Sequence, residues 1–158
     1  MARLIACVLL LNFALFAGAS AAFASSVDEL LAAEQAPPGV VFEIVSGDSD
    51  LLGDLLPDVG KDIERLRKRF PDLPVVIVSH GEEQFALTND RQQTETKLHS
   101  LAEELVTEQD VTLHVCETYA GWFGVAPGDF PEFVDVAAAG PAQINDYRAL
   151  DYVVITLP

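Results

Sequence analysis

One stretch decides how this chain folds: Thr112-Leu-His-Val-Cys116-Glu-Thr-Tyr-Ala-Gly-Trp-Phe-Gly124. Apolar and polar side chains alternate over 111–115, which predicts a strand. After it, side chains recur at spacings of three, four and seven, which predicts a helix with one face made of Cys116, Tyr119, Ala120 and Phe123. Gly124 is a typical helix stop. The stretch therefore predicts that a strand turns into a helix at Cys116.

Cys116 is the candidate nucleophile of the chain. A sulfur at such a turn lies near the N–H groups of the first helical turn and the positive end of the helix macrodipole, and both favour the thiolate. The other cysteine, Cys7, lies in the N-terminal leader. Without the leader, an exported protein would carry Cys116 as its single thiol, with no partner for an internal disulfide.

The N-terminus has the features of a secretory signal peptide. Arg3 precedes an apolar run from Leu4 to Phe16, and small residues follow up to Ala22-Phe-Ala24. We predict that residues 1–24 are a signal peptide and that residues 25–158 form a single domain. The protein is therefore expected in the periplasm or outside the cell, with no stable membrane anchor after cleavage.

The chain is strongly acidic, with 25 Asp and Glu residues, 9 Lys and Arg residues and a formal net charge of -16. This charge argues against nucleic acid and anionic membranes as partners. A basic cluster nevertheless extends from Lys61 to Arg69 on a predicted helix. We interpret it as a solvated helix face, with docking of an acidic partner or of another subunit's acidic surface as the alternative.

Strands and helices alternate along the chain. Apolar runs predict further strands over 40–45, 75–79, 133–137 and 152–156. Helical stripes between them are formed by Val59, Ile63, Leu66 and Phe70, by Leu98, Leu101, Ala102 and Leu105, and by Ile144, Tyr147 and Leu150. His99 is expected on an exposed helix face, and 85–91 as a loop. This order predicts an α/β fold, a three-layer α/β/α sandwich around a mainly parallel sheet of about five strands.

Three loops are expected to meet at one edge of this sheet, because the carboxyl ends of parallel strands lie together. They contain Ser46–Asp50, His80–Glu83 and Cys116–Tyr119. The sequence has no glycine-rich nucleotide fingerprint and no G-x-S-x-G motif. It therefore gives no indication of a nucleotide cofactor or of a conventional hydrolase.

The chain resembles the DsrE/DsrF-like family of sulfur-relay proteins, which includes the TusD-type carriers, from about Val40 to Leu157. The resemblance is carried by the apolar strand, the cysteine and the small, aromatic helix quoted above, and then by Gly124-Val125, Phe133-Val-Asp-Val136, Gly140, Ile144 and Tyr152-Val-Val-Ile155. It implies that Cys116 matches the reactive cysteine that some members have at the start of the helix after the third strand. It also implies assembly into homo- or hetero-oligomers, and the aromatic residues Trp122 and Phe130 are expected on a contact surface.

Three interpretations of Cys116 remain open. In the first, it carries sulfur as a persulfide between a donor and an acceptor protein, in a sulfurtransferase-like relay. His80 and His114 would favour the thiolate, Tyr119 would lie nearby, and Glu117 would oppose the thiolate by its negative charge. In the second, Cys116 is a buried structural residue of an oligomeric interaction module. In the third, less favoured one, Cys116 joins the two histidines in a soft-metal site; we expect no cofactor and no metal.

Overall fold

A computed structural model of the protein describes residues 26–157, so the predicted signal peptide and its cleavage site lie outside the described residues. The elements in chain order are α1 (Val27–Ala32), β1 (Val40–Ile44), α2 (Leu51–Arg69), β2 (Val75–Ser79), η1 (Glu82–Leu87), η2 (Asn89–Arg91), α3 (Thr96–Thr107), β3 (Val111–Cys116), α4 (Glu117–Trp122), η3 (Pro127–Asp129), β4 (Asp135–Ala137), α5 (Gly140–Ala149) and β5 (Val153–Leu157). None of the helices described is both long and apolar enough to span a bilayer.

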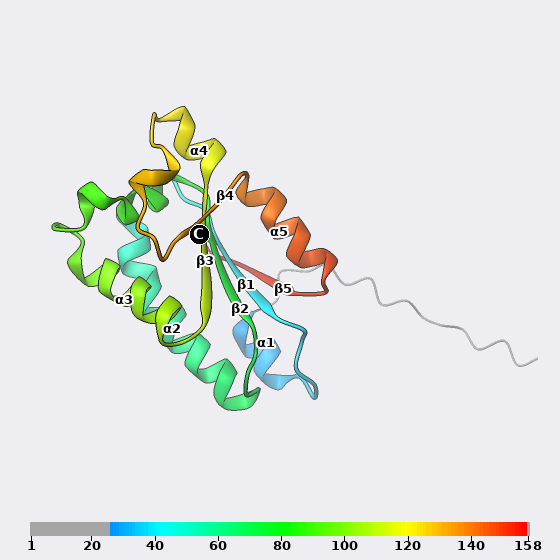
Figure 1. The fold of residues 1–158 in the computed structure, drawn as a ribbon. Coiled ribbons are helices and arrows are strands. Elements are labelled where there is room, and N and C mark those ends of the chain that lie inside the picture. Colours follow the sequence, from blue (N-terminus) through cyan, green and yellow to red (C-terminus); the bar gives the residue numbers. More distant parts are fainter. Residues whose placement is uncertain (1–25, 158) are drawn as a thin grey trace, which may run out of the picture.

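The five strands form one sheet in the order β4-β3-β2-β1-β5, and every neighbouring pair is parallel. The chain moves outward from β1 through β2 and β3 to the edge strand β4, and then returns to add β5 on the other side of β1. Right-handed crossovers in opposite directions place the connecting helices on opposite faces. Figure 1 shows this arrangement, with α2 and α3 on one side of the sheet and α5 on the other. The predicted α/β/α sandwich is confirmed.

Each face of the sheet has its own apolar core. Side chains of α2 and α3, among them Leu52, Ile63 and Leu105, pack on one face, in the larger core. On the other face, Ile144 of α5 packs against valines of β1, β2 and β5, in a smaller core. The near-continuous apolar sequence of β1 and β2 follows from this burial on both faces.

The basic cluster at the end of α2 mostly contacts its own chain. Arg65 forms ion pairs with Asp28 and Asp62, and Lys61 pairs with Asp58. Arg67 donates hydrogen bonds to backbone carbonyls after α2 and after α3, including that of Leu73 at 3.2 Å. Cations in the last turn also complement the helix dipole. These contacts give the cluster a role inside the fold.

Two predictions about the C-terminal part were wrong in detail. The fourth strand begins at Asp135 rather than Phe133, because Val134 N–H is used in a turn to Pro131 and pairing with β3 begins only at His114. Leu150 is 60% exposed rather than part of the buried stripe of α5. The helix ends at Ala149, so the side chain of Leu150 no longer follows the helical period.

Three further expectations were corrected. Phe130 is only 5% exposed, because it packs into the larger core from the end of η3. His99 is buried, since its Nε2 lies 3.0 Å from the carbonyl oxygen of Ala86 and so ties α3 to η1. The segment 85–91 is not an open loop but belongs to the two short 3-10 helices η1 and η2. The burial of Phe130 and of His99 arises from tertiary contacts, whereas the 3-10 helices are closed by local hydrogen bonds such as that from Thr88 N–H to the Phe85 carbonyl oxygen.

Candidate functional site

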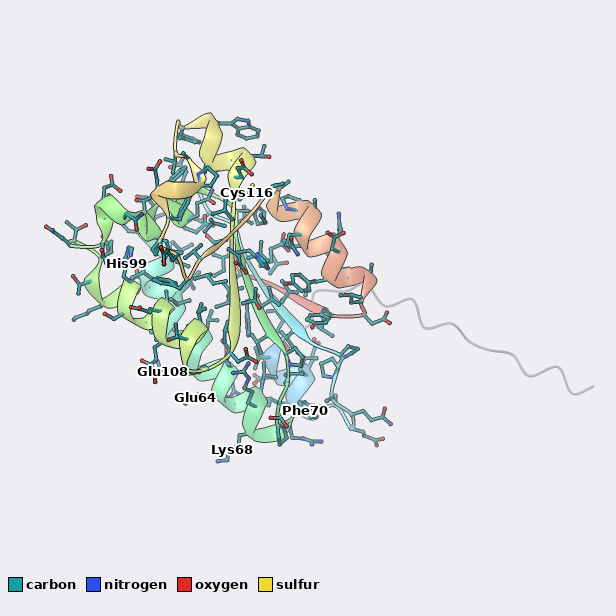
Figure 2. All side chains as sticks on the ribbon, viewed as in Figure 1. Glu64, Lys68, Phe70, His99, Glu108 and Cys116 are labelled. Atoms are coloured by element: carbon teal, nitrogen blue, oxygen red, sulfur yellow. The ribbon has the colours of Figure 1, made fainter. Side chains whose placement is uncertain are left out.

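Cys116 lies at the carboxyl end of β3 and is the N-cap residue of α4, as the sequence predicts. Its Sγ accepts a hydrogen bond from Tyr119 N–H at 3.4 Å. The residue is only 4% exposed. Figure 2 shows it at the upper end of the sheet, where β3 meets α4. A sulfur that accepts an N–H at a helix N-cap is in a position that favours negative charge, but this residue is almost completely buried.

Two buried polar side chains of η1 support this edge of the sheet. Gln84 Oε1 accepts the backbone N–H of Cys116 at 2.7 Å. Glu83 Oε1 accepts hydrogen bonds from Ser79 Oγ and from Gly81 N–H, and Glu83 Oε2 accepts one from Ser46 N–H, all within 2.9 Å. The ends of β1, β2 and β3 are therefore held together from η1. Sequence reasoning missed both roles, because the partner N–H groups belong to distant segments.

His80 belongs to a polar group on the α5 face of the sheet. Its Nε2 lies 3.1 Å from Glu43 Oε1, and Glu43 Oε2 accepts a hydrogen bond from Thr156 at 2.8 Å. Arg148 of α5 adds a guanidinium 3.8 Å from the same carboxylate. Sequence reasoning missed Glu43, although a charged residue inside a buried parallel strand is itself a signal that it has a partner.

The strand register brings His80 beside Cys116. Ser79 pairs with Val115, so the next residues along the two segments are His80, which follows β2, and Cys116, which ends β3. Both continue the α5 face, since successive side chains alternate across a strand. The first turn of α5 also lies against His80, because a Cβ placed on Gly140 would be 2.5 Å from His80 Cβ.

His114 lies two residues before Cys116 and is engaged elsewhere. Its Nε2 is 2.9 Å from the hydroxyl oxygen of Tyr147 on α5. Burial lowers the pKa of His114, and the charge of Asp135 on the neighbouring strand partly opposes this effect. Burial also raises the pKa of Tyr147. His114 and Tyr147 therefore form a contact between two uncharged side chains that links β3 to α5.

The soft-metal interpretation requires a set of ligands around Cys116 and the two histidines. Within residues 26–157, no group of three or more His, Cys, Asp and Glu side chains is arranged to hold a metal ion. The Nε2 atoms of the two predicted histidines face Glu43 and Tyr147, respectively. The structure therefore brings His80 and Cys116 onto adjacent positions without forming a metal site.

The remaining predicted residues lie on α4. Glu117 is exposed in the first turn of the helix. The ring of Tyr119 joins an aromatic cluster with Phe85, Trp122 and Phe123. Burial, followed by the charges of Glu82 and Glu83, raises the pKa of the Tyr119 phenol. Tyr119 therefore contributes its backbone N–H to Cys116 and its ring to the surface of α4.

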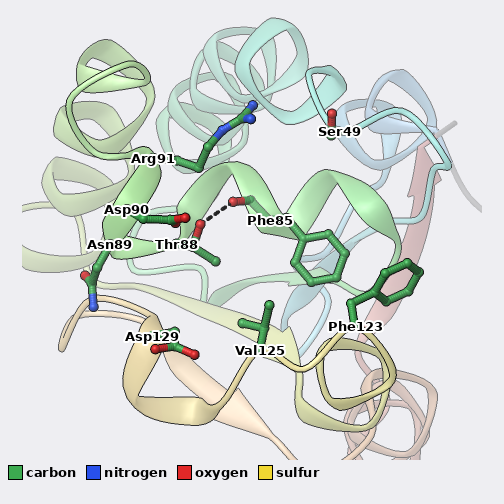
Figure 3. Close-up of a pocket in the computed structure, with 9 residues that line it drawn as sticks. All are labelled: Ser49, Phe85, Thr88, Asn89, Asp90, Arg91, Phe123, Val125 and Asp129. Carbon is green, nitrogen blue, oxygen red and sulfur yellow. Dashed lines mark hydrogen bonds between the residues drawn. The ribbon is translucent and has the colours of Figure 1, made fainter.

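A pocket of about 590 Å³ lies next to this aromatic cluster. As Figure 3 shows, it is lined by Ser49, Phe85, Thr88, Asn89, Asp90, Arg91, Phe123, Val125 and Asp129. These residues come from the loop after β1, from η1 and η2, and from the segment between α4 and β4. Cys116 itself does not line the pocket.

Comparison with known proteins identifies the fold. No family model and no curated protein sequence matches the chain. Among solved structures, the chain is similar to MTH1491 from Methanobacterium thermoautotrophicum, a protein of unknown function, with a TM-score of 0.57 and 20% identity over 75% of this chain and 97% of that one. It is also similar to the ychN protein from E. coli, with a TM-score of 0.55 and 14% identity over 75% of this chain and 98% of that one. The chain thus has the α/β fold of DsrE/DsrF-like structures, with five parallel strands flanked by helices.

Proposed function

We propose that this protein is an exported sulfur carrier that holds sulfane sulfur as a persulfide on Cys116. The observation that carries the proposal is the place of the only cysteine in residues 26–157. It caps a helix at the carboxyl edge of the sheet, and its sulfur accepts the N–H of Tyr119. A donor N–H directed at sulfur and the positive end of the helix both stabilise a thiolate.

The chemistry is a pair of thiol exchanges. The Cys116 thiolate attacks the outer sulfur of a donor persulfide, a new S–S bond forms, and the donor leaves as a thiolate. The transferred sulfur keeps its proton, so Cys116 becomes Cys–S–SH. An acceptor thiolate then attacks that outer sulfur and releases the Cys116 thiolate. No external oxidant or reductant is consumed.

The burial of Cys116 requires a local opening before either exchange, and α4, whose first turn caps the sulfur, is the element that we propose to move. This helix has only six residues, and the side chains at its end are exposed. Short elements with few buried contacts open at a smaller free-energy cost than global unfolding. The same burial favours a second candidate function, an interaction module in which Cys116 is a structural residue.

The proposal includes the surroundings of the protein. The leader sequence supports a periplasmic or secreted location. The resemblance of the sequence to the DsrE/DsrF-like family is the basis for proposing homo-oligomers that exchange sulfur with donor and acceptor proteins. The net charge of -16 supports protein partners over nucleic acid. Outside the cytoplasm, the burial of Cys116 would also protect a persulfide on it from oxidation.

The test is intact-mass analysis after treatment with inorganic polysulfide. The full chain is expressed with Cys7→Ser, so that Cys116 is its only thiol whether or not the leader is removed. We expect single sulfur atoms to be added to the native protein and to be lost on reduction. The same chain with Cys116→Ser should gain none. The mass of the untreated protein also tests cleavage after Ala24.

Resistance of the native thiol would overturn the carrier proposal. If Cys116 takes up neither sulfur nor iodoacetamide over hours in buffer, but reacts with both in urea, it is a structural core residue. That result would leave the interaction module as the function.

A further inference from the structure

The surface of α4 exposes apolar side chains beside the pocket. Trp122 is 74% exposed and Phe123 is 56% exposed. They form, with Tyr119 and Phe85, a contiguous aromatic face, in which the ring of Phe123 lies 5.2 Å from that of Phe85 and 5.3 Å from that of Tyr119. Large aromatic groups exposed together on a charged protein indicate a contact surface. We call these four residues the aromatic face.

The aromatic face continues into the pocket. Phe85 and Phe123 belong to both, and Val125 extends the apolar wall. The volume of about 590 Å³ is within the range of pockets that bind small molecules or anchoring side chains. An apolar group that enters the pocket would therefore bury aromatic surface that is now exposed to water.

The rim of the pocket is negatively charged. Asp90 and Asp129 line it. Its one cation, Arg91, is already paired with Asp50 at 3.3 Å and with Glu95 at 3.6 Å. A second copy of this acidic chain would bring like charges together, whereas a basic segment would be attracted. The charge pattern thus selects a basic partner.

The same helix joins the pocket to the buried thiol. Tyr119 donates its backbone N–H to Cys116 Sγ and contributes its ring to the aromatic face. Phe123 is the C-cap residue of α4. A group that draws these rings toward the pocket therefore pulls on the helix whose first turn caps the Cys116 sulfur.

We infer that the pocket and the aromatic face dock a basic, apolar-anchored segment of another protein, and that docking moves α4 away from Cys116. This inference rests on the proposed function, since it identifies the kind of protein that would exchange sulfur with Cys116. It also accounts for a reactive position that is buried, and therefore reacts only slowly, in the isolated chain.

The probe is a capped peptide in which a leucine–phenylalanine pair is flanked by two lysines on each side. The control peptide has glutamates in place of the lysines. Trp122 is the only tryptophan of the chain, so its fluorescence reports binding to the aromatic face. The Cys7→Ser chain gives a single thiol, so iodoacetamide labelling reports exposure of Cys116. We expect saturable binding of the lysine peptide and a labelling rate at least about tenfold higher in the bound protein.

Matched variants distinguish binding at the pocket from binding to other apolar or acidic parts of the surface. Phe123→Ser should weaken binding about tenfold, as expected for loss of a central aromatic contact. Leu150→Ser removes an equally exposed apolar side chain at the end of α5 and should leave binding unchanged. Asp90→Lys should also weaken binding, whereas Asp146→Lys on the exposed side of α5 should change it much less.

Any of four results would overturn the inference. One is equal binding of the two peptides, and another is equal binding by Phe123→Ser and Leu150→Ser. The third is binding without faster labelling, which would separate docking from the thiol. If Trp122 fluorescence changes with protein concentration alone and Phe123→Ser abolishes that change, a second copy fills the pocket instead. None of these readouts involves sulfur transfer, so docking and the carrier function can fail separately.

Discussion

Glu83 shows how a single buried carboxylate holds the edge of the sheet on which the proposed site depends. Its two oxygens accept three hydrogen bonds from the ends of β1 and β2, and the side chain is wholly buried. Gly81 must lie against this carboxylate and against the backbone of Ser46, because a Cβ at Gly81 would be 2.3 Å from the Ser46 carbonyl oxygen. A carboxylate with only acceptor atoms fits a site made only of donors.

We predict that Glu83→Gln lowers the free energy of unfolding by about 2–3 kcal/mol, because the new amide N–H₂ would face a donor and leave it unpaired. The measurement is urea unfolding followed by far-UV circular dichroism. Glu82→Gln is the matched control, since the neighbouring Glu82 side chain is partly exposed. Equal stability of the two variants would contradict this account of Glu83.

At the scale of elements, the contact between β3 and α5 depends on a neutral histidine. His114 is buried, its Nε2 contacts the hydroxyl of Tyr147, and burial lowers its pKa below the usual 6.5. The folded protein therefore binds fewer protons at this site than the unfolded chain does. The resulting stability is fully present above pH 6.5 and is lost as the pH falls from there through the lower pKa of the folded state.

We predict that the free energy of unfolding of the wild-type protein falls between pH 7.5 and pH 5 more steeply than that of His114→Gln. The variant has no titratable side chain at position 114. Urea unfolding across this pH range measures both slopes, and their difference removes the contribution of the carboxylates. Identical slopes would show that His114 is protonated as easily in the folded protein as in the unfolded chain.

At the scale of the whole molecule, we predict self-association through the apolar side chains that remain exposed away from the aromatic face. These are Val45 and Leu150. Because the chain carries a net charge of -16, repulsion between copies opposes association, and added salt should increase the oligomeric fraction.

Light scattering at micromolar protein concentration, at low and high salt, measures this prediction. Leu150→Ser should weaken self-association and leave peptide binding intact. Phe123→Ser should weaken peptide binding and leave self-association intact. A protein that stays monomeric at both salt concentrations would contradict the prediction.

The sequence alone determined the fold class and the position of Cys116. The continuous apolar runs of β1 and β2, the alternation in β3 and the helical stripes between them reflect burial that is periodic along the chain, so local pattern was sufficient. The same logic explains why the strand-to-helix turn at Cys116 could be predicted.

Only the tertiary structure decided which side chains meet there. Glu43 contacts Thr156 across a separation of 113 residues, and Cys116 N–H reaches Gln84 across 32. Such pairs depend on the order of the strands and on the short helix η1, neither of which leaves a periodic signal. Burial of Phe130 and His99 and exposure of Leu150 likewise follow from packing between segments that the local pattern does not connect. Local periodicity records which face of an element is buried, whereas the partner that buries it is chosen by the whole fold.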